Sequence, residues 1–167
     1  MICLIAKLDE VSTRKLRALQ AVAAARGASP RPLYGHITIA SYVGDDEEAF
    51  VRDCKELLAG AASFAVNYLK IEVLSETSII VASPENAGEL ARLHEEVEAR
   101  FADSLDRWTS WEDWYPHTTL LYVPEADLER ICEEMQKAFE PFEAKVERLE
   151  FSKVTECGYD IFERILL

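Results

Sequence analysis

The chain is poor in positive charge and in histidine. Its 167 residues contain 18 Lys and Arg against 31 Asp and Glu, which gives a formal net charge of −13, and they contain three His. A protein this acidic repels polyphosphate at long range. We therefore expect no duplex nucleic acid as a partner, whereas a small nucleotide or an RNA 3′ end is compatible with this charge if the site itself is neutral or basic.

Long apolar runs and closely spaced cysteines are also missing. No stretch approaches the roughly 20 apolar residues of a membrane span, and Met1 to Lys7 lack the basic start and long apolar core of a signal peptide. The four cysteines are far apart, without the paired spacing of a metal site. These absences predict a cytoplasmic protein with buried free thiols and no membrane partner. We also expect the chain to be a monomer.

Two copies of one short pattern organise the chain. The first runs from Tyr34 to Ile39 (YGHITI) and the second from Tyr115 to Leu120 (YPHTTL), and their histidines are 81 residues apart. Side chains alternate between faces in a strand, so each His and the Thr two residues later point the same way. Two such faces meeting across a cleft would bring two imidazoles and two hydroxyls together.

The order of the expected elements also repeats. Strand, helix, His strand, helix and strand occur twice, and the apolar helical stripe from Phe50 to Leu58 matches that from Ile131 to Phe139 at the same offset. Strand alternation slips after Tyr68 and again after Val146, which predicts a β-bulge at corresponding places. A duplicated lobe explains this pattern. We expect a single bilobal domain over 1–167, with repeats at 1–75 and 76–156 and a closing strand at 159–166.

The predicted fold class is α+β, with pseudo-two-fold duplicated lobes of antiparallel-rich sheet and helices on the outer faces. Helix starts are expected at Ser12, at Asp45, at Pro84 and at Pro124, on capping and proline preferences. His94 lies on the third helix among three glutamates, and we expect it to be solvated.

Two His-x-Thr motifs, each followed by a hydrophobic residue and separated by half of a chain of this size, resemble those of the 2H phosphoesterase superfamily. That superfamily includes the enzymes named 2′-5′ RNA ligases and the cyclic phosphodiesterases. The resemblance implies the bilobal fold, His36 and His117 as catalytic residues, and Thr38 and Thr119 as phosphate-binding residues. It also implies hydrolysis of a 2′,3′-cyclic phosphate, as in many members, whereas others act on 2′-5′ linkages or trim RNA 3′ ends.

The chemistry of phosphodiesters fits two histidines. In-line displacement needs a base on the attacking oxygen and an acid on the leaving oxygen, and the ordinary His pKa of roughly 6.5 permits either form near neutral pH. Thr hydroxyls can donate to the non-bridging oxygens, where negative charge is held. This arrangement requires no metal and no other cofactor. The symmetric pattern does not distinguish the base from the acid.

Other interpretations are open at this level. The histidines could be satisfied core residues or metal ligands, although no His-Glu-x-x-His spacing is present. Tyr34 and Tyr115 could contact substrate or pack within the sheet, and Trp111 and Trp114 could form a base-stacking wall or cover the core. The leading hypothesis is a metal-independent phosphodiesterase, a phosphoric diester hydrolase. The alternative is a non-catalytic nucleotide- or RNA-end-binding module of the same fold.

Overall fold

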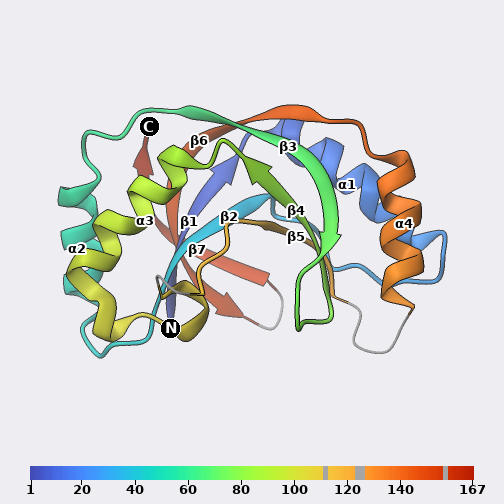
Figure 1. Cartoon of the computed structure of the whole chain (residues 1–167). Helices are drawn as coiled ribbons and strands as arrows, with labels where there is room; N and C mark the ends of the chain where they lie inside the picture. The colour runs from blue at the N-terminus through green and yellow to red at the C-terminus, as the bar shows by residue number, and fades with distance from the viewer. Residues whose placement is uncertain (111–112, 123–126, 156–157) are drawn as a thin grey trace.

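Seven strands form one strongly bent sheet in the computed structural model, which describes residues 1–110, 113–122, 127–155 and 158–167. Their order is β2-β1-β6-β3-β4-β5, with β7 paired to the C-terminal half of β6, and each described pairing is antiparallel. In Figure 1, β3 and β6 cross the top of the molecule. The strands are β1 (Ile2–Leu8), β2 (His36–Tyr42), β3 (Phe64–Val73), β4 (Ile79–Glu85), β5 (Thr118–Tyr122), β6 (Phe142–Thr155) and β7 (Gly158–Leu166).

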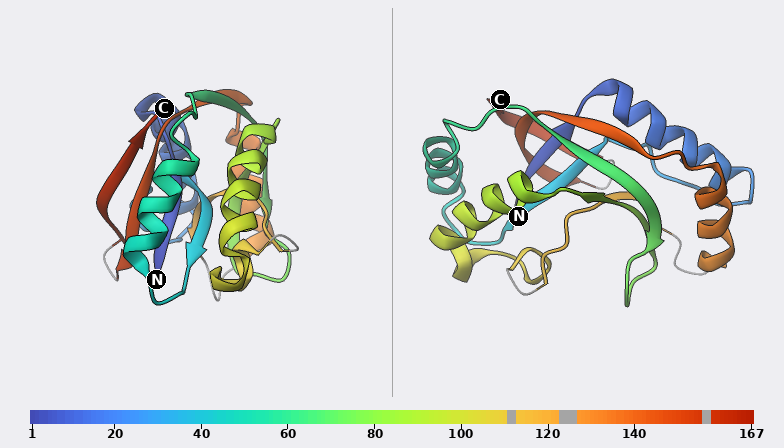
Figure 2. Two further views of the ribbon diagram at one scale, coloured as in Figure 1. Left: turned by 90° about the vertical axis from the view of Figure 1, so that its left-hand side faces the viewer. Right: turned by 45° about the horizontal axis from the view of Figure 1, so that its top comes forward.

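Four α-helices cover the two ends of this sheet. They are α1 (Glu10–Ala24), α2 (Glu47–Leu57), α3 (Gly88–Phe101) and α4 (Leu128–Ala138). α1 packs against α4 at one end, and α2 lies beside α3 at the other (Figures 1 and 2). This arrangement confirms the predicted α+β class and its antiparallel sheet. Within the described residues, no helix has the length and apolar character needed to cross a membrane.

The strand order reads the same from both ends when β1 is exchanged with β4, β2 with β5, and β3 with β6. A duplication of about half the chain would produce such a palindrome. The expected repeats, 1–75 and 76–156, are interleaved in space rather than side by side. α1 from the first half packs against β5 from the second, α3 packs against β2, and each helix pair takes one member from each half.

Both predicted bulges are present. Between β3 and β4 the register passes from Tyr68↔Pro84 to Lys70↔Ser83, which leaves Leu69 unpaired. Between β6 and β1 it passes from Val146↔Leu8 to Arg148↔Lys7. A bulge reverses the alternation of the strand that carries it. The buried residues of β3 are therefore even-numbered before the bulge and odd-numbered after it. In β6 the buried hydrophobic residues shift in the same way, from Ala144 and Val146 to Leu149 and Phe151, and the polar Glu150 and Ser152 are buried as well.

The predicted helix starts need correction. Asp9 caps α1 by accepting from the backbone N–H of Ser12, so Ser12 lies inside the helix. Asp46, not Asp45, caps α2. Pro84 opens no helix, because it lies in β4 beside the bulge, where the missing amide proton is tolerated, and α3 begins at Gly88. Pro124 lies outside the described residues.

The edge strands β2 and β5 are joined by a buried hydrogen-bond chain. The Thr118 hydroxyl lies 2.9 Å from the carbonyl oxygen of His36 and 2.6 Å from the Tyr68 hydroxyl. A carbonyl has no proton to give, so Thr118 donates to His36 and Tyr68 donates to Thr118. Tyr68 is 0% and Thr118 1% exposed, so neither group has water as an alternative partner.

Ser104, Asp106 and Trp114 cover more of the β2 edge. Val43 N–H donates to the Ser104 carbonyl, and Asp106 N–H donates to the Ser41 carbonyl. The indole N–H of Trp114 donates to the Thr38 carbonyl at 3.0 Å. These contacts satisfy backbone groups that an open sheet edge would leave exposed.

We expect Thr118→Val to lower the free energy of unfolding by about 1–3 kcal/mol, because it leaves the His36 carbonyl and the Tyr68 hydroxyl buried without this partner. Thr118→Ser keeps the hydroxyl and should lose less. Urea unfolding followed by circular dichroism measures both variants. A Thr118→Val protein as stable as the wild type would show that the chain does not hold the two edges together.

Candidate functional site

His36 and His117 stand at equivalent places on the two edge strands. His36 is the first residue of β2, and His117 directly precedes β5. Ile37 and Thr118 are buried in the core, so the alternation of the strands directs both imidazoles to the opposite side. The Thr118–His36 hydrogen bond holds these two segments together. The structure thus brings together the two histidines that the sequence singled out, and both are half-buried.

A backbone carbonyl orients the imidazole of His117. Its Nδ1 lies 2.7 Å from the carbonyl oxygen of Tyr115, and because a carbonyl can only accept, Nδ1 carries the proton of this bond. Nε2 is then the atom that can gain or lose a proton in a reaction. Burial lowers the pKa of His117, and the bond to Tyr115 opposes this by favouring the protonated ring.

His36 has a different environment. Its Nδ1 is buried and has no hydrogen-bond partner among the described residues. The ring of Tyr159 on β7 packs edge-on at 4.4 Å between centroids. Burial, then the positive charges of Lys7 and of His117, lower the pKa of His36 to about 3. His36 is therefore neutral at physiological pH.

The threonines of the motifs lie on the same side as the histidines. Thr38 alternates with the buried Ile37 and Ile39, and Thr119 alternates with the buried Thr118 and Leu120. Within the part of the chain that the structure describes, neither hydroxyl has a hydrogen-bond partner. Both can therefore donate to a bound oxyanion.

Tyr34 and Tyr115 each donate their hydroxyl to a carboxylate. Tyr34 Oη lies 2.6 Å from Glu150 Oε2, and Tyr115 Oη lies 2.6 Å from Glu72 Oε1. Burial and then the bond to Glu150 raise the pKa of Tyr34 to about 12. The hydroxyl protons of both tyrosines are thus already donated to carboxylates. The centroids of their rings lie 6.1 Å from that of His36 and 6.4 Å from that of His117, respectively.

The two carboxylates are functional candidates that the sequence reasoning missed. Each follows a cation by two residues on a bulged strand: Lys70 Nζ lies 2.8 Å from Glu72, and Arg148 Nε lies 2.7 Å from Glu150. The two cation-x-Glu sequences are 78 residues apart, which is the signal that could have revealed them. In both strands the bulge turns the pair from the core side to the side of the histidines.

The His36 side of the site carries a concentration of positive charge. Glu150 is fully buried and also accepts from Arg164 Nε at 3.2 Å. Lys7 lies on the neighbouring strand between His36 and Arg148. Three cations that are distant in sequence therefore surround one carboxylate here, which leaves this part of an acidic protein suited to an anion.

The sequence left two roles open for the tryptophans, a base-stacking wall or a cover of the core. Trp111 lies outside the described residues. The indole of Trp114 stacks on His94 at 4.1 Å and 8°, and its N–H bonds to Thr38, so much of it belongs to the packing between α3 and β2. The prediction that His94 is solvated is wrong: its side chain is fully buried, and its Nδ1 lies 2.8 Å from the carbonyl oxygen of Ile39.

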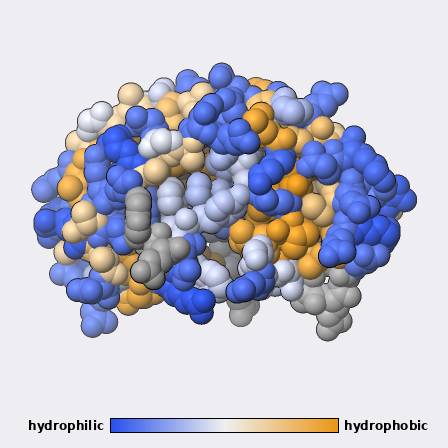
Figure 3. Space-filling model, viewed as in Figure 1, coloured by the Kyte–Doolittle hydropathy of each residue, from blue (hydrophilic) through white to orange (hydrophobic). Residues whose placement is uncertain are grey.

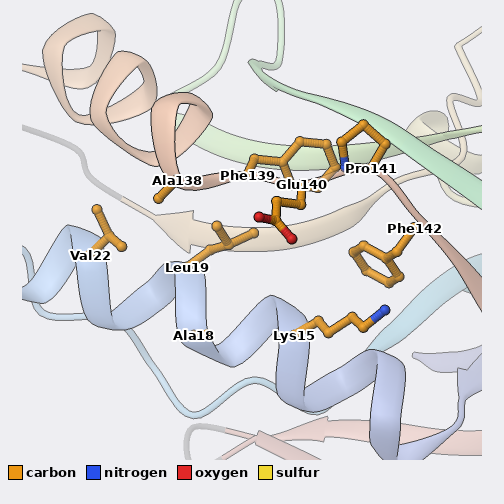
Figure 4. Close-up of a pocket in the computed structure, with 9 residues that line it drawn as sticks. All are labelled: Lys15, Ala18, Leu19, Val22, Ala138, Phe139, Glu140, Pro141 and Phe142. Atoms are coloured by element: carbon orange, nitrogen blue, oxygen red, sulfur yellow. The ribbon is translucent and has the colours of Figure 1, made fainter.

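Two other hollows lie away from the histidines. One, of about 380 Å³, separates α1 from the α4–β6 junction and is lined largely by apolar side chains, with Lys15 and Glu140 at its rim (Figure 4). The other is an open groove of about 880 Å³ with many charged residues, between α2 and β7. Neither contains a residue of the two motifs. In Figure 3, hydrophilic side chains cover the ends of the molecule, and apolar ones reach the surface beside β3 and β4.

No group of three or more His, Cys, Asp or Glu within the described residues is arranged to hold a metal ion. This finding does not bear on the prediction that the reaction requires no metal, which chelation in an activity assay would test.

Solved structures with the same fold include TT0787 of Thermus thermophilus, at 21% identity and a TM-score of 0.72 over 99% of this chain and 97% of that one. LigT of E. coli, solved with 3′-AMP, matches at 13% identity and 0.66 over 99% and 96%. Usb1 of Kluyveromyces marxianus, solved with uridine monophosphate, matches at 12% and 0.57 over 99% and 97%. At these identities the similarity shows the fold. No curated protein sequence matches the chain.

The family model described as the 2′-5′ RNA ligase superfamily matches residues 8–156, a span that contains both His-x-Thr motifs and both cation-x-Glu sequences. The chain therefore belongs to the 2′-5′ RNA ligase superfamily of 2H phosphoesterases.

Proposed function

We propose that this protein is a metal-independent phosphodiesterase that acts on a small 2′,3′-cyclic phosphate or on an RNA-terminal phosphodiester. The observation that carries the proposal is the joining of His36 and His117 on one side of the sheet, each followed by a threonine whose hydroxyl is available. Membership of the 2H phosphoesterases suggests phosphodiester chemistry. Neighbours of the same fold were solved with small nucleotides, which supports a substrate of that size.

The proposed step is an in-line displacement at phosphorus. The oxygen of a water molecule forms a bond to phosphorus while one neutral imidazole takes a proton from that water. The bond from phosphorus to one ribose oxygen breaks, and the second, protonated imidazole gives its proton to that oxygen. Thr38 and Thr119 donate to the two non-bridging oxygens, whose negative charge is greatest in the transition state.

The surroundings suggest how a nucleotide is held. The rings of Tyr34 and Tyr115 flank the histidines and are proposed nucleoside contacts, as are Trp111 and Trp114. The cations on the His36 side would attract a phosphate of a short chain end, whereas the net charge of −13 disfavours a long duplex. We propose a cytoplasmic monomer for this role.

Replacement of either histidine tests the proposed function. His36→Ala and His117→Ala should each lower kcat/KM for 2′,3′-cyclic AMP by roughly 10²- to 10⁴-fold, since each removes one proton-transfer group. Chelation with EDTA should leave the wild-type rate unchanged. Lys137→Ala, which removes an exposed charge on α4, serves as the matched control. Unchanged rates in both His variants would refute the mechanism, and nucleotide binding without turnover by the wild type would favour the binding module.

The threonines are expected to act on the transition state. Thr38→Val and Thr119→Val should each lower kcat by roughly 100-fold with a smaller change in KM, because the lost donor matters most when charge has developed. Thr38→Ser and Thr119→Ser keep the hydroxyl and should retain most of the rate. A Val variant that raised KM alone would instead assign the hydroxyl to ground-state binding.

A further inference from the structure

Equivalent backbone atoms in the two halves of the site have different partners. The carbonyl of Tyr115, two residues before His117, accepts the Nδ1 proton of that histidine. The carbonyl of Tyr34, two residues before His36, accepts instead from the ammonium of Lys7. The same ammonium donates to the Gly35 carbonyl at 3.1 Å, and His36 Nδ1 has no partner among the described residues.

The local sequence explains why the first half alone adopts this arrangement. Gly35 has φ +73°, and a Cβ there would lie 2.3 Å from Thr13 Oγ1, so the position favours glycine. The matching residue is Pro116, whose ring holds φ near −65°. On the neighbouring strand, Lys7 lies opposite His36. The β4–β5 pairing ends at Ala82↔Thr118, and the next residue of β4, in the place that corresponds to Lys7, is the neutral Ser83.

The ammonium of Lys7 is fixed beside His36 by burial and by hydrogen bonds. It is 7% exposed, and its three N–H donors have three oxygen acceptors, the third being Thr13 Oγ1 at 3.4 Å. Burial lowers the pKa of Lys7, and the nearby charge of Glu150 opposes that shift. Glu150 and three oxygen acceptors thus stabilise an ammonium beside His36.

We propose that Lys7 is a positioning residue that makes the two histidines unequal, keeping His36 neutral as the base and leaving His117 as the acid. The assignment of base and acid rests on the proposed function. The difference between His36 and His117 in their affinity for a proton is a property of the protein without substrate and does not depend on that function.

The other groups around His36 support the same direction. The positive charge of His117 acts on it from the segment before β5, and the phenols of Tyr34 and Tyr159 pack against it from the segment before β2 and from β7. Arg148 and Glu150 lie on β6, beyond Lys7. Glu150, the one carboxylate in this group, already bonds two arginines and Tyr34. Around His117, by contrast, the Tyr115 carbonyl favours the imidazolium.

In the resulting step, His36 Nε2 takes the proton of the attacking water as the oxygen–phosphorus bond forms. The bond from phosphorus to the ribose oxygen breaks, and His117 Nε2 supplies the proton to that oxygen. Proton exchange with solvent then returns both rings to their starting forms.

Titration of the imidazole C2 protons by NMR tests the inequality without substrate. In the wild type, His36 should take up its proton at a lower pH than His117. Lys7→Met should raise the midpoint of His36 by about one pH unit and leave that of His117 in place. Lys7→Gln retains hydrogen-bond donors without the charge and should give the same shift. Lys55→Met, which removes an exposed cation paired with Glu163 on β7, is the matched control.

A His36 midpoint above that of His117 in the wild type would overturn the proposal, and this measurement does not depend on whether any Lys7 variant folds. An unchanged His36 midpoint in folded Lys7→Met and Lys7→Gln would overturn it as well.

A substrate with an activated leaving group tests the roles. In thymidine 3′-(4-nitrophenyl phosphate), which has no 2′-hydroxyl, water is again the nucleophile, and nitrophenolate leaves without help from an acid. The fold-decrease in rate caused by His117→Ala should then be at least about 10 times smaller on this substrate than on 2′,3′-cyclic AMP. The fold-decrease caused by His36→Ala should be the same on both substrates. The reverse pattern would overturn the assignment. Failure of the wild type on both substrates would refute the proposed function and leave the titration result standing.

Discussion

The hydrogen bond from Thr118 to the His36 carbonyl is the contact on which the site depends, because it joins the two edges of a single bent sheet. Open edges expose unpaired backbone groups, and here side chains satisfy them: Thr118 at one carbonyl and Trp114 at that of Thr38. Both acceptors belong to the first motif, and both donors belong to the second motif or the segment just before it. The contacts that close the fold are thus the same contacts that place the two histidines together.

The sequence predicted the elements and the faces of the strands well, because alternation and helical spacing are local patterns. It did not predict that the halves interleave, since the placement of β6 between β1 and β3 is a long-range choice of partners. His94 was misjudged from its three glutamate neighbours, although Leu90, Leu93, His94 and Val97 form one buried helical stripe. Pro84 was misjudged because the bulge that tolerates it lies on another strand.

The same distinction applies to the site. The motifs of His36 and His117 could be recognised because each is complete within six consecutive residues. Glu72 and Glu150 could not, because they meet Tyr115 and Tyr34 across neighbouring strands. The positions of the bulges were predicted, but not their effect on the carboxylates. Tyr68 and Val146 face the core, and in a regular strand Glu72 and Glu150, four residues later, would face the core too. One unpaired residue in each strand moves these carboxylates to the side of the histidines.

Two histidines at equivalent places of the fold would be chemically equal if their surroundings were equal. Two equal imidazoles would share one proton between two equivalent arrangements, of which one suits a given substrate orientation. Only about half of the molecules would then carry the proton on the histidine that the substrate needs as the acid. A twofold loss of active protein is too small to explain why a lysine is buried at this place. The substrate itself is asymmetric, however, with water on one side of phosphorus and a ribose oxygen on the other. In the proposed mechanism Lys7, with Arg148 and Arg164 on the same side, gives the site a matching direction. Gly35, close to Thr13, provides the backbone carbonyl that Lys7 binds.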